Sequence, residues 1–331
     1  MNEVRVGVLG CGKIASKHLN SYQKIDEFDV TITDIKPEKA RTAADKHNVA
    51  YAEDPDDVLE DPDIDAIDVC IPVNAHQEVI ETALQEGKDV FCEKPLARTA
   101  DEAREIKAVA DETDNQIMVG YLYRFHPAFE IAKEAIEDGI IGDPHYAMFR
   151  VGGRGSHRAW KHQAETGGGA TNEMLVHMLD LIVWWFGAPA ATEALWTDTI
   201  LDEREIDGET VEANAEDIVV LRATAGDGTE ILCESDLITP SYMNGIEVHG
   251  SDGSVLTSIL DHFPTSIYCN EPTAIYDRGH NFHEFSRVDL FEKELLHFGE
   301  CVTNGNKPDQ NTVEDAIKVR QIIDDALQDC T

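Results

Sequence analysis

The amino-acid sequence predicts an α/β fold in which a doubly wound parallel sheet is followed by a second domain of the α+β class. In the first third, short runs of β-branched residues alternate with helical patterns. A glycine-rich turn joins the first of these runs to the first helical pattern. After about residue 125, strand patterns instead follow one another directly. A chain of 331 residues is long enough for about two domains, and we place them at residues 1–124 and 125–331.

The elements of the first domain follow from hydrophobic periodicity. The predicted strands are 4–9, 30–33, 66–71, 89–92 and 116–119, and the predicted helices are 14–23, 37–47, 75–86 and 100–111. Strands that alternate with helices of this length form βαβ units, which build a parallel sheet.

The second domain begins with a helix at 128–138 and a strand at 144–151, and a glycine run at 167–169 then precedes a helix at 170–186. Further strands are predicted at 190–197, 215–223, 229–237, 245–249 and 254–260, before two final helices at 290–303 and 312–327. The dipeptides Asp227-Gly228 and Asp252-Gly253 are typical of the tight turns in antiparallel hairpins.

The charge balance restricts the partners of the protein. It has 27 Lys and Arg against 65 Asp and Glu, a formal net charge of −38, and the acids are spread along the chain. Such a polyanion repels nucleic acid and anionic membrane surfaces, so we expect neither as a partner. Dispersed acid with few lysines is typical of proteins that work in concentrated salt, where screening removes most of the self-repulsion. We therefore expect a halophilic source, the alternative being an ordinary acidic protein.

The sequence also indicates a cytoplasmic protein. Its first residues form a strand pattern without a signal peptide, and no apolar stretch is long enough to span a membrane. The seven cysteines are odd in number and none has Cys-x-x-Cys spacing, so we expect reduced thiols.

The glycine-rich turn has the spacing of a dinucleotide-binding fingerprint. Gly10 permits a tight turn, Gly12 permits close approach of a pyrophosphate, and Ala15 permits close helix–strand packing. Asp34, at the end of the second strand, is placed to accept hydrogen bonds from ribose hydroxyls and to repel a 2′-phosphate. The pattern predicts NAD, with NADP less favoured, although the nearby Lys36 and Lys39 soften that preference. The alternative is a structural turn without a ligand.

Two further segments carry candidate catalytic residues. Lys94 follows strand 89–92 at its carboxyl end, where open α/β sheets bind ligands. Glu173, His177 and Asp180 share one face of a helix, and a Glu173–His177 hydrogen bond would tune the ring as a proton acceptor. The alternatives are a solvated loop lysine and an exposed polar helix face.

These segments together resemble the Gfo/Idh/MocA family, the glucose–fructose oxidoreductase and inositol dehydrogenase group. The resemblance rests on the fingerprint with Asp34, on Glu93-Lys94-Pro95, on residues 121–127, on the 167–180 segment and on the two C-terminal helices. It implies an N-terminal Rossmann domain and a C-terminal α+β domain with a large open, mainly antiparallel sheet. That sheet would carry the substrate site and the contacts of a homodimer or homotetramer.

The resemblance also assigns roles to residues of this chain. Lys94 would bind the reacting hydroxyl, His177 would be the acid/base, and Pro95 would follow a peptide bond that is often cis. Glu173 stands where Asp is usual, and Leu175 stands where Gly is common. The expected catalytic residues are Lys94, His177 and Glu173; the cofactor-binding residues are Gly10, Gly12, Lys13, Ile14, Asp34, Pro72, His76, Glu93 and Lys94; the substrate-binding residues are Lys94, Tyr123, Arg124, Arg154, Trp160, Glu173 and His177.

The function these residues imply is an NAD(P)-dependent dehydrogenase acting on a secondary alcohol of a sugar, polyol or sugar derivative. The basic cluster of Arg154, His157, Arg158 and Lys161 favours an anionic or polyhydroxyl ligand. Two alternatives stay open: a glycosidase that uses NAD for transient oxidation, and a non-catalytic NAD-binding sensor. We expect no metal, because neither His157 with His162 nor His280 with His283 forms a recognised ligand pattern.

Overall fold

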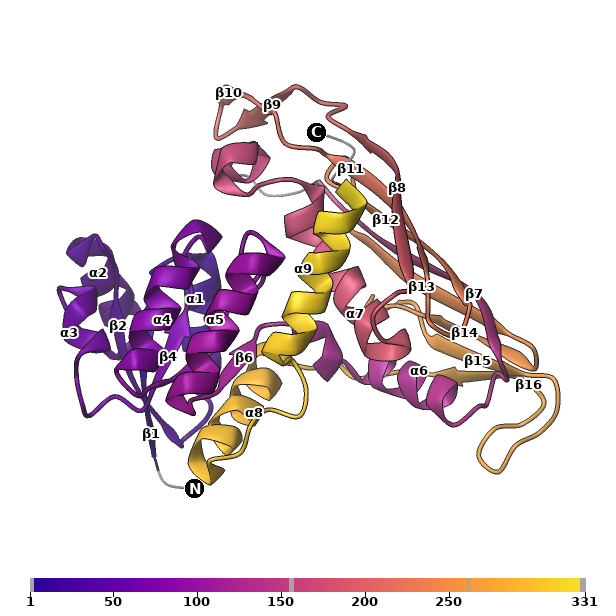
Figure 1. Ribbon diagram of the computed structural model, residues 1–331, viewed down its shortest axis with the longest axis horizontal. Helices are drawn as coiled ribbons and strands as arrows, with labels where there is room; N and C mark the ends of the chain where they lie inside the picture. The colour runs from indigo at the N-terminus through magenta and orange to yellow at the C-terminus, as the bar shows by residue number, and fades with distance from the viewer. Residues whose placement is uncertain (1–2, 155–157, 261, 328–331) are drawn as a thin grey trace. The chain divides into compact units, whose positions relative to one another are not determined.

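A computed structural model describes residues 3–154, 158–260 and 262–327, so His157 lies outside the described part of the chain. The chain forms two compact units (Figure 1). The first comprises the residues up to Leu122 together with Asp289–Arg320, and the second comprises Tyr123–Val288 and the residues from Gln321 onward.

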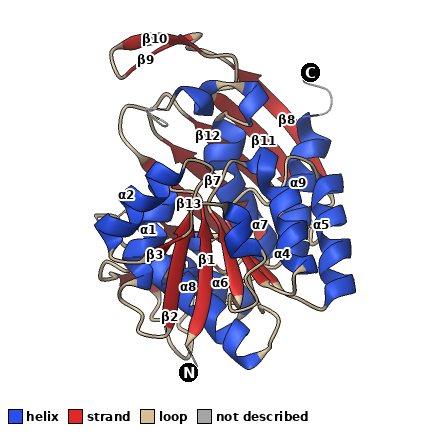
Figure 2. Ribbon diagram, turned by 90° about the vertical axis from the view of Figure 1, so that its left-hand side faces the viewer, coloured by secondary structure: helices blue, strands red, loops and turns tan. Residues whose placement is uncertain are grey.

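The first unit contains the predicted parallel sheet, with six strands in the order β3-β2-β1-β4-β5-β6. The strands are β1 (Val4–Leu9), β2 (Phe28–Thr33), β3 (Ala50–Tyr51), β4 (Ala66–Val69), β5 (Asp89–Cys92) and β6 (Ile117–Val119). The connecting helices are α1 (Lys13–Tyr22), α2 (Pro37–His47), α3 (Pro55–Leu59), α4 (His76–Gln85) and α5 (Ala100–Thr113). α1 packs with α2, and α4 packs with α5 (Figure 2). This is the Rossmann arrangement.

Helix α8 (Leu290–Asn304) belongs to the first unit, which a division at residue 124 does not anticipate. Its Phe298 ring packs against Phe91 of β5 with ring centroids 5.6 Å apart. Gly299 lies so close to the Phe28 ring that an added Cβ would stand 2.4 Å from it. The apolar face of α8 thus completes the core beside α1, and the last helix, α9 (Val313–Leu327), begins in this unit too. The second compact unit is therefore not the continuous span 125–331.

The second unit is built on an eight-stranded sheet in the order β16-β15-β14-β13-β7-β12-β11-β8. Its strands are β7 (Pro144–Gly152), β8 (Ala191–Asp198), β11 (Ile218–Thr224), β12 (Glu230–Asp236), β13 (Met243–Gly250), β14 (Gly253–Thr257), β15 (Thr265–Cys269) and β16 (Gly279–His283). All neighbouring pairs are antiparallel except β7 with β12. A separate hairpin pairs β9 (Glu203–Ile206) with β10 (Glu209–Glu212). The large, mainly antiparallel sheet is as predicted.

Helices α6 (Pro127–Glu137) and α7 (Val176–Phe186) pack against one face of this sheet (Figure 1). Phe149 of β7 is fully buried and its ring lies 5.4 Å from that of Trp185 in α7. Tyr146, Trp196 and Phe282, from three other places in the sheet, remain exposed. The sheet therefore carries both a buried core face and exposed aromatic side chains.

Most predicted elements are found within a few residues of their expected ends, and strand 89–92 and helix 37–47 match fully. The predicted helix 170–186 begins as a π-helix at Thr171–Leu175 before it continues as α7. Among the described residues, no helix is long and apolar enough to cross a membrane. The six described cysteines are free thiols, and all but Cys11 are buried.

Candidate functional site

The glycine-rich turn between β1 and α1 has the geometry of an anion-binding turn. Gly10 has φ +100°, and a Cβ there would stand 2.6 Å from the Cys70 carbonyl oxygen, so only glycine fits. Gly12 caps α1, and a Cβ built on it would meet nothing within 4 Å. Packing within the described protein therefore does not require glycine at position 12, whereas a ligand approaching the backbone would.

The N-terminus of α1 has neither a side-chain cap nor an acidic residue in its first turn. Its free N–H groups and its partial positive charge therefore suit a phosphate. Gly12 and Lys13 are exposed at this end, and Ile14 is half-buried. The residues present fit the pyrophosphate of a dinucleotide.

Asp34 lies beside the same turn, at the end of β2. Its Oδ2 accepts a hydrogen bond from the Cys11 N–H at 2.9 Å, and its Oδ1 accepts one from the Lys36 N–H at 3.0 Å. These two bonds fix the carboxylate while each oxygen keeps a lone pair for a further donor. The side chain is half-buried, so ribose hydroxyls can reach it.

The turn after β5 carries Lys94, whose side chain is half-buried, and the Lys94–Pro95 peptide is cis, as the resemblance predicted. His76, at the start of α4, is buried beside this turn. Its Nε2 lies 2.9 Å from the Ile71 carbonyl oxygen and its Nδ1 lies 3.2 Å from that of Leu96. Burial lowers the pKa of His76, and a neutral imidazole has one N–H, so it donates to only one of these two carbonyls. His76 thus lies between two loops at the carboxyl end of the sheet, while Pro72 stays exposed at the start of the first of them.

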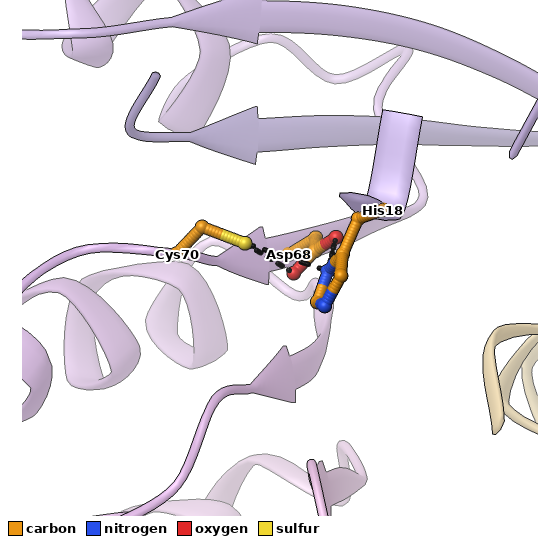
Figure 3. A group of neighbouring side chains, drawn as sticks. All are labelled: His18, Asp68 and Cys70. Carbon is orange, nitrogen blue, oxygen red and sulfur yellow. Dashed lines mark hydrogen bonds and ion pairs between the residues drawn. The ribbon is translucent and has the colours of Figure 1, made fainter. Parts of the chain in front are cut away.

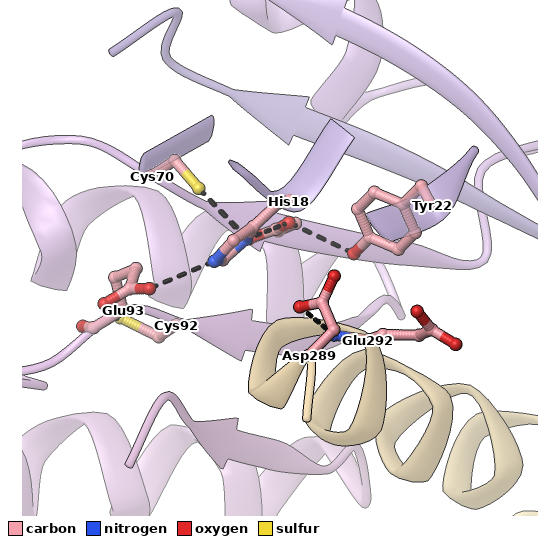
Figure 4. Close-up of polar contacts among 8 residues, drawn as sticks. His18, Tyr22, Cys70, Cys92, Glu93, Asp289 and Glu292 are labelled. Atoms are coloured by element: carbon pink, nitrogen blue, oxygen red, sulfur yellow. Dashed lines mark hydrogen bonds and ion pairs between the residues drawn. The ribbon is translucent and has the colours of Figure 1, made fainter. Parts of the chain in front are cut away.

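A buried polar cluster lies between α1, β4 and β5, and the sequence analysis missed it (Figure 3). His18 Nδ1 lies 2.8 Å from Asp68 Oδ2, and His18 Nε2 lies 3.0 Å from Glu93 Oε1. The Tyr22 hydroxyl also donates to Asp68 Oδ2, at 3.1 Å (Figure 4). The available signal was Asp68 itself, an acidic residue inside a buried parallel strand that is otherwise apolar.

Two triads in this cluster bring possible metal-ligating atoms within 4.8 Å of one another: His18, Asp68 and Cys70, and His18, Glu93 and Glu294. Both triads need His18, whose two nitrogens already face carboxylate oxygens at hydrogen-bonding distance. Because a carboxylate only accepts, both nitrogens carry protons and neither offers a lone pair to a metal. The hydrogen-bonded arrangement therefore explains the cluster better than a metal site does.

In the second unit, His177 lies on the first turn of α7 and is 8% exposed. Its ring packs against that of Tyr123, with centroids 4.7 Å apart and an interplanar angle of 34°. The Tyr123 hydroxyl lies 2.5 Å from the Tyr242 hydroxyl. Burial raises the pKa of both phenols, so both remain neutral donors. Tyr242, which no sequence pattern predicted, contacts the predicted site residue Tyr123, and Tyr123 in turn packs against His177.

Glu173 lies in the π-helix that precedes α7 and forms an ion pair with Lys161. The Lys161 ammonium also lies 5.2 Å from the centre of the Trp160 ring, which is 39% exposed. The structure thus brings together the Glu173 carboxylate, the Lys161 ammonium and the Trp160 ring, all from the 158–177 segment. The Glu173–His177 hydrogen bond expected from helical spacing stays a prediction.

Arg124, predicted to bind substrate, is instead buried against α7. Its Nη2 lies 2.6 Å from Asp180 Oδ1, and its Nε lies 3.0 Å from Asp180 Oδ2. This position favours a structural role over direct contact with substrate. Arg154, by contrast, is exposed.

Comparisons with known proteins agree with this arrangement. Residues 4–121 match a family described as an oxidoreductase family with an NAD-binding Rossmann fold, and residues 129–256 match the GFO/IDH/MocA C-terminal domain. The scyllo-inositol 2-dehydrogenase (NAD(+)) of Bacillus subtilis is 30% identical over 93% of this chain and 88% of its own. The myo-inositol 2-dehydrogenase of Thermotoga maritima is 28% identical over 92% and 89%. A levoglucosan dehydrogenase structure with NADH and levoglucosan has a TM-score of 0.89 at 21% identity, covering 99% of this chain and 96% of that one.

Proposed function

Because the chain belongs to the GFO/IDH/MocA family of oxidoreductases, we propose that this NAD-dependent enzyme oxidises a secondary alcohol of a sugar, polyol or sugar derivative. The observation that carries the proposal is the turn at Gly12 and Asp34, where an uncapped helix terminus and a fixed carboxylate suit a pyrophosphate and a ribose. The relatives named for inositol and levoglucosan support a polyhydroxyl substrate.

The residues of the first unit bind and orient the cofactor in this proposal. The N–H groups after Gly12 hold the pyrophosphate, and Asp34 accepts hydrogen bonds from the ribose hydroxyls. A carboxylate at this place repels a 2′-phosphate, which favours NAD over NADP. NAD, when bound, supplies the acceptor for a hydride.

Lys94, Glu173 and His177 carry the proton chemistry in this proposal. His177 takes the proton of the reacting hydroxyl, and the Lys94 ammonium stabilises the alkoxide that develops. Glu173, which forms an ion pair with Lys161, orients the His177 ring. Tyr123 packs against the imidazole and keeps it in one orientation.

The substrate contacts in this proposal come from groups that suit several hydroxyls at once. Tyr242, Trp160 and Arg154 are exposed and offer a phenol, an indole and a guanidinium. These groups can hydrogen-bond to a neutral polyol, and the Arg154 guanidinium also suits an anionic one, so the substrate class is the question for experiment.

The test is NADH formation from NAD against a panel of inositols, sugars and sugar acids, in about 2 M KCl to screen the acidic surface. We expect reduction with one polyol class and a fall of at least about 100-fold in kcat for Lys94→Ala and for His177→Asn. NADH binding by both variants, followed by fluorescence, should change little. If both variants keep the activity of the wild type, the proposed roles of Lys94 and His177 are excluded. Cleavage of an aryl glycoside without net NADH would favour the glycosidase alternative, and NADH binding without either reaction would favour a sensor.

We further propose that the protein is a cytoplasmic homodimer or homotetramer. The large open sheet supports association, because it leaves the aromatic side chains of Tyr146, Trp196 and Phe282 exposed. Light scattering after size exclusion, in high salt, tests this: a mass equal to one chain of 36.7 kDa would exclude it.

A further inference from the structure

The buried cluster around His18 lies in the core of the first unit, directly beneath the turn that carries Lys94. Glu93 is the residue before Lys94, and its side chain is 12% exposed, whereas those of His18 and Asp68 are fully buried. The cluster therefore extends from the buried side chains of His18 and Asp68 to Glu93, the residue before Lys94 (Figure 4).

The hydrogen bonds determine the charge of the ring. A neutral imidazole has one N–H and can donate to only one of the two carboxylates that face it. Burial alone would lower the pKa of His18, but the Asp68 charge, the neighbouring Cys70 and the hydrogen bonds to both outweigh burial, and the pKa stands well above its usual value. His18 is therefore an imidazolium between two carboxylates.

The other groups that face the ring are consistent with one positive charge there. Tyr22 and Cys70 donate toward Asp68. Glu294 of α8 is fully buried, and neither of its oxygens has a hydrogen-bond partner among the residues that the structure describes. Burial, and then the Glu93 charge, raise the Glu294 pKa well above its usual value, which favours the neutral, protonated acid. The rings of Phe91 and Phe291 close the remaining sides.

We propose that His18 is a positioning residue for Lys94: anchored to Asp68 in β4, it holds the Glu93 carboxylate and so fixes the first residue of the turn that carries the Lys94 ammonium. His76 lies against the far end of the same turn, with its Nδ1 3.2 Å from the Leu96 carbonyl oxygen. The two buried histidines thus lie against the residues on either side of Lys94-Pro95. The importance of this arrangement for turnover rests on the dehydrogenase function proposed above.

The first test measures Lys94 directly, without relying on catalysis. The rate at which an amine-reactive anhydride modifies Lys94 is followed by peptide mass spectrometry across pH, with exposed Lys318 as the internal reference. We expect His18→Gln, which removes the charge, to change the relative Lys94 rate at least about threefold and to shift its pH profile. Tyr22→Phe is the matched control, since it removes a buried hydrogen bond from Asp68 on the side away from Glu93. It should lower thermal stability and leave the Lys94 rate unchanged.

The second test is a double-mutant cycle between His18→Gln and Glu93→Gln. If His18 acts through Glu93, each single variant lowers kcat at least about tenfold, and His18→Gln keeps an NADH affinity within about threefold of wild type. The double variant is then no slower than the slower single variant, because the two changes break one connection. If the two single effects on kcat multiply in the double variant, the proposal is overturned. It is also overturned if His18→Gln keeps both the kcat and the Lys94 labelling rate of the wild type.

The two tests separate this inference from the proposed function. Changed Lys94 labelling in a protein that oxidises no polyol would leave the positioning role intact and refute only the dehydrogenase. If His18→Gln does not fold, the Lys94 labelling rate is measured instead in Glu93→Gln, at the edge of the cluster. Unchanged Lys94 labelling in that variant would overturn the proposal.

Discussion

The Arg124 guanidinium and the Asp180 carboxylate form an ion pair that is almost completely buried, with Nη2 and Oδ1 2.6 Å apart and 2% and 1% of the two side chains exposed. The pair joins the segment after β6 to α7 within the second unit. The Trp184 ring lies 5.7 Å from the same guanidinium. Arg124 therefore fixes the helix that carries His177.

Breaking this pair should destabilise the second unit strongly. Asp180→Asn leaves a buried guanidinium without a counter-charge, and we expect the free energy of unfolding to fall by about 3–5 kcal/mol. Urea unfolding at constant KCl measures the change. Glu230→Gln, which breaks the exposed pair with Arg222, is the control and should have almost no effect. Equal unfolding midpoints for the two variants would contradict the structural role of Arg124.

The glycine run before the π-helix provides a second prediction. Gly169 has φ +106°, and an added Cβ would stand 2.4 Å from Glu216 Oε1, which accepts a hydrogen bond from the Thr171 N–H. Gly169→Ala should therefore combine backbone strain with the loss of that bond and cost more than about 2 kcal/mol. Gly208→Ala is the matched control, because Gly208 has φ +85° but open space around its Cβ. Thermal unfolding of both variants should show the larger shift for Gly169→Ala.

The sequence was sufficient to predict the sheet of the first unit because parallel buried strands are continuous apolar runs between helices. It did not predict β3 or α3, which have two and five residues and are too short for a periodic signal. Strands β9, β10, β15 and β16 were also missed. β9, β10 and β16 have few fully buried positions, so their hydrophobic alternation is weak.

The sequence was sufficient to predict candidate residues for the site, but not the side chains that they contact. Asp34 lies at the end of the second strand, where its spacing from the glycine-rich turn placed it, and the bond after Lys94 is cis, as the resemblance implied. The π-helix changes the helical phase between Glu173 and His177, so spacing alone could not determine which groups meet. The contacts of His18 with Asp68 and Glu93, and of Arg124 with Asp180, join residues at least 50 positions apart. No single-sequence pattern encodes such distant pairs.

Asp34 should determine both the affinity for the cofactor and the choice between its two forms. Asp34→Ala removes the acceptor for ribose hydroxyls and the hydrogen bond that holds the Cys11 N–H. We expect NADH to bind about tenfold more weakly and the ratio of NADH to NADPH affinity to fall further, because the repulsion of a 2′-phosphate is lost. Fluorescence titration measures both constants. Asp29→Ala, at an exposed position of the same strand, is the control. An unchanged affinity ratio would exclude a role for Asp34 in cofactor choice.

Salt should stabilise this protein because its net charge is −38. At about 0.1 M ionic strength, charges about 10 Å apart still interact, whereas at about 1 M the screening length is about 3 Å. The self-repulsion of the folded state is then largely removed, and we expect the unfolding temperature to rise steeply between these KCl concentrations. Calorimetry measures the change, with tetramethylammonium chloride distinguishing screening from specific K⁺ binding. An unfolding temperature independent of salt would exclude the halophilic interpretation of the composition.

Glu294 should make the folded protein less stable as the pH rises, the opposite of what an ion-paired carboxylate does. Burial and the nearby Glu93 raise its pKa well above the ordinary value of 4.5, so the folded protein keeps a proton that the unfolded chain loses above that value. The folded state then binds more protons than the unfolded state, and its stability falls by up to about 1.4 kcal/mol per pH unit from this one group.

Glu294→Gln isolates this effect, because an amide has nearly the shape of the protonated acid and does not ionise. We expect the variant to gain stability relative to wild type as the pH rises from about 5 to about 8, with the gain read from urea unfolding at constant KCl. Glu300→Gln, at an exposed position of α8, should differ from wild type by the same amount at every pH. If the Glu294→Gln difference is equally constant, Glu294 is ionised in the folded protein, and a cation or water must then satisfy its buried oxygens.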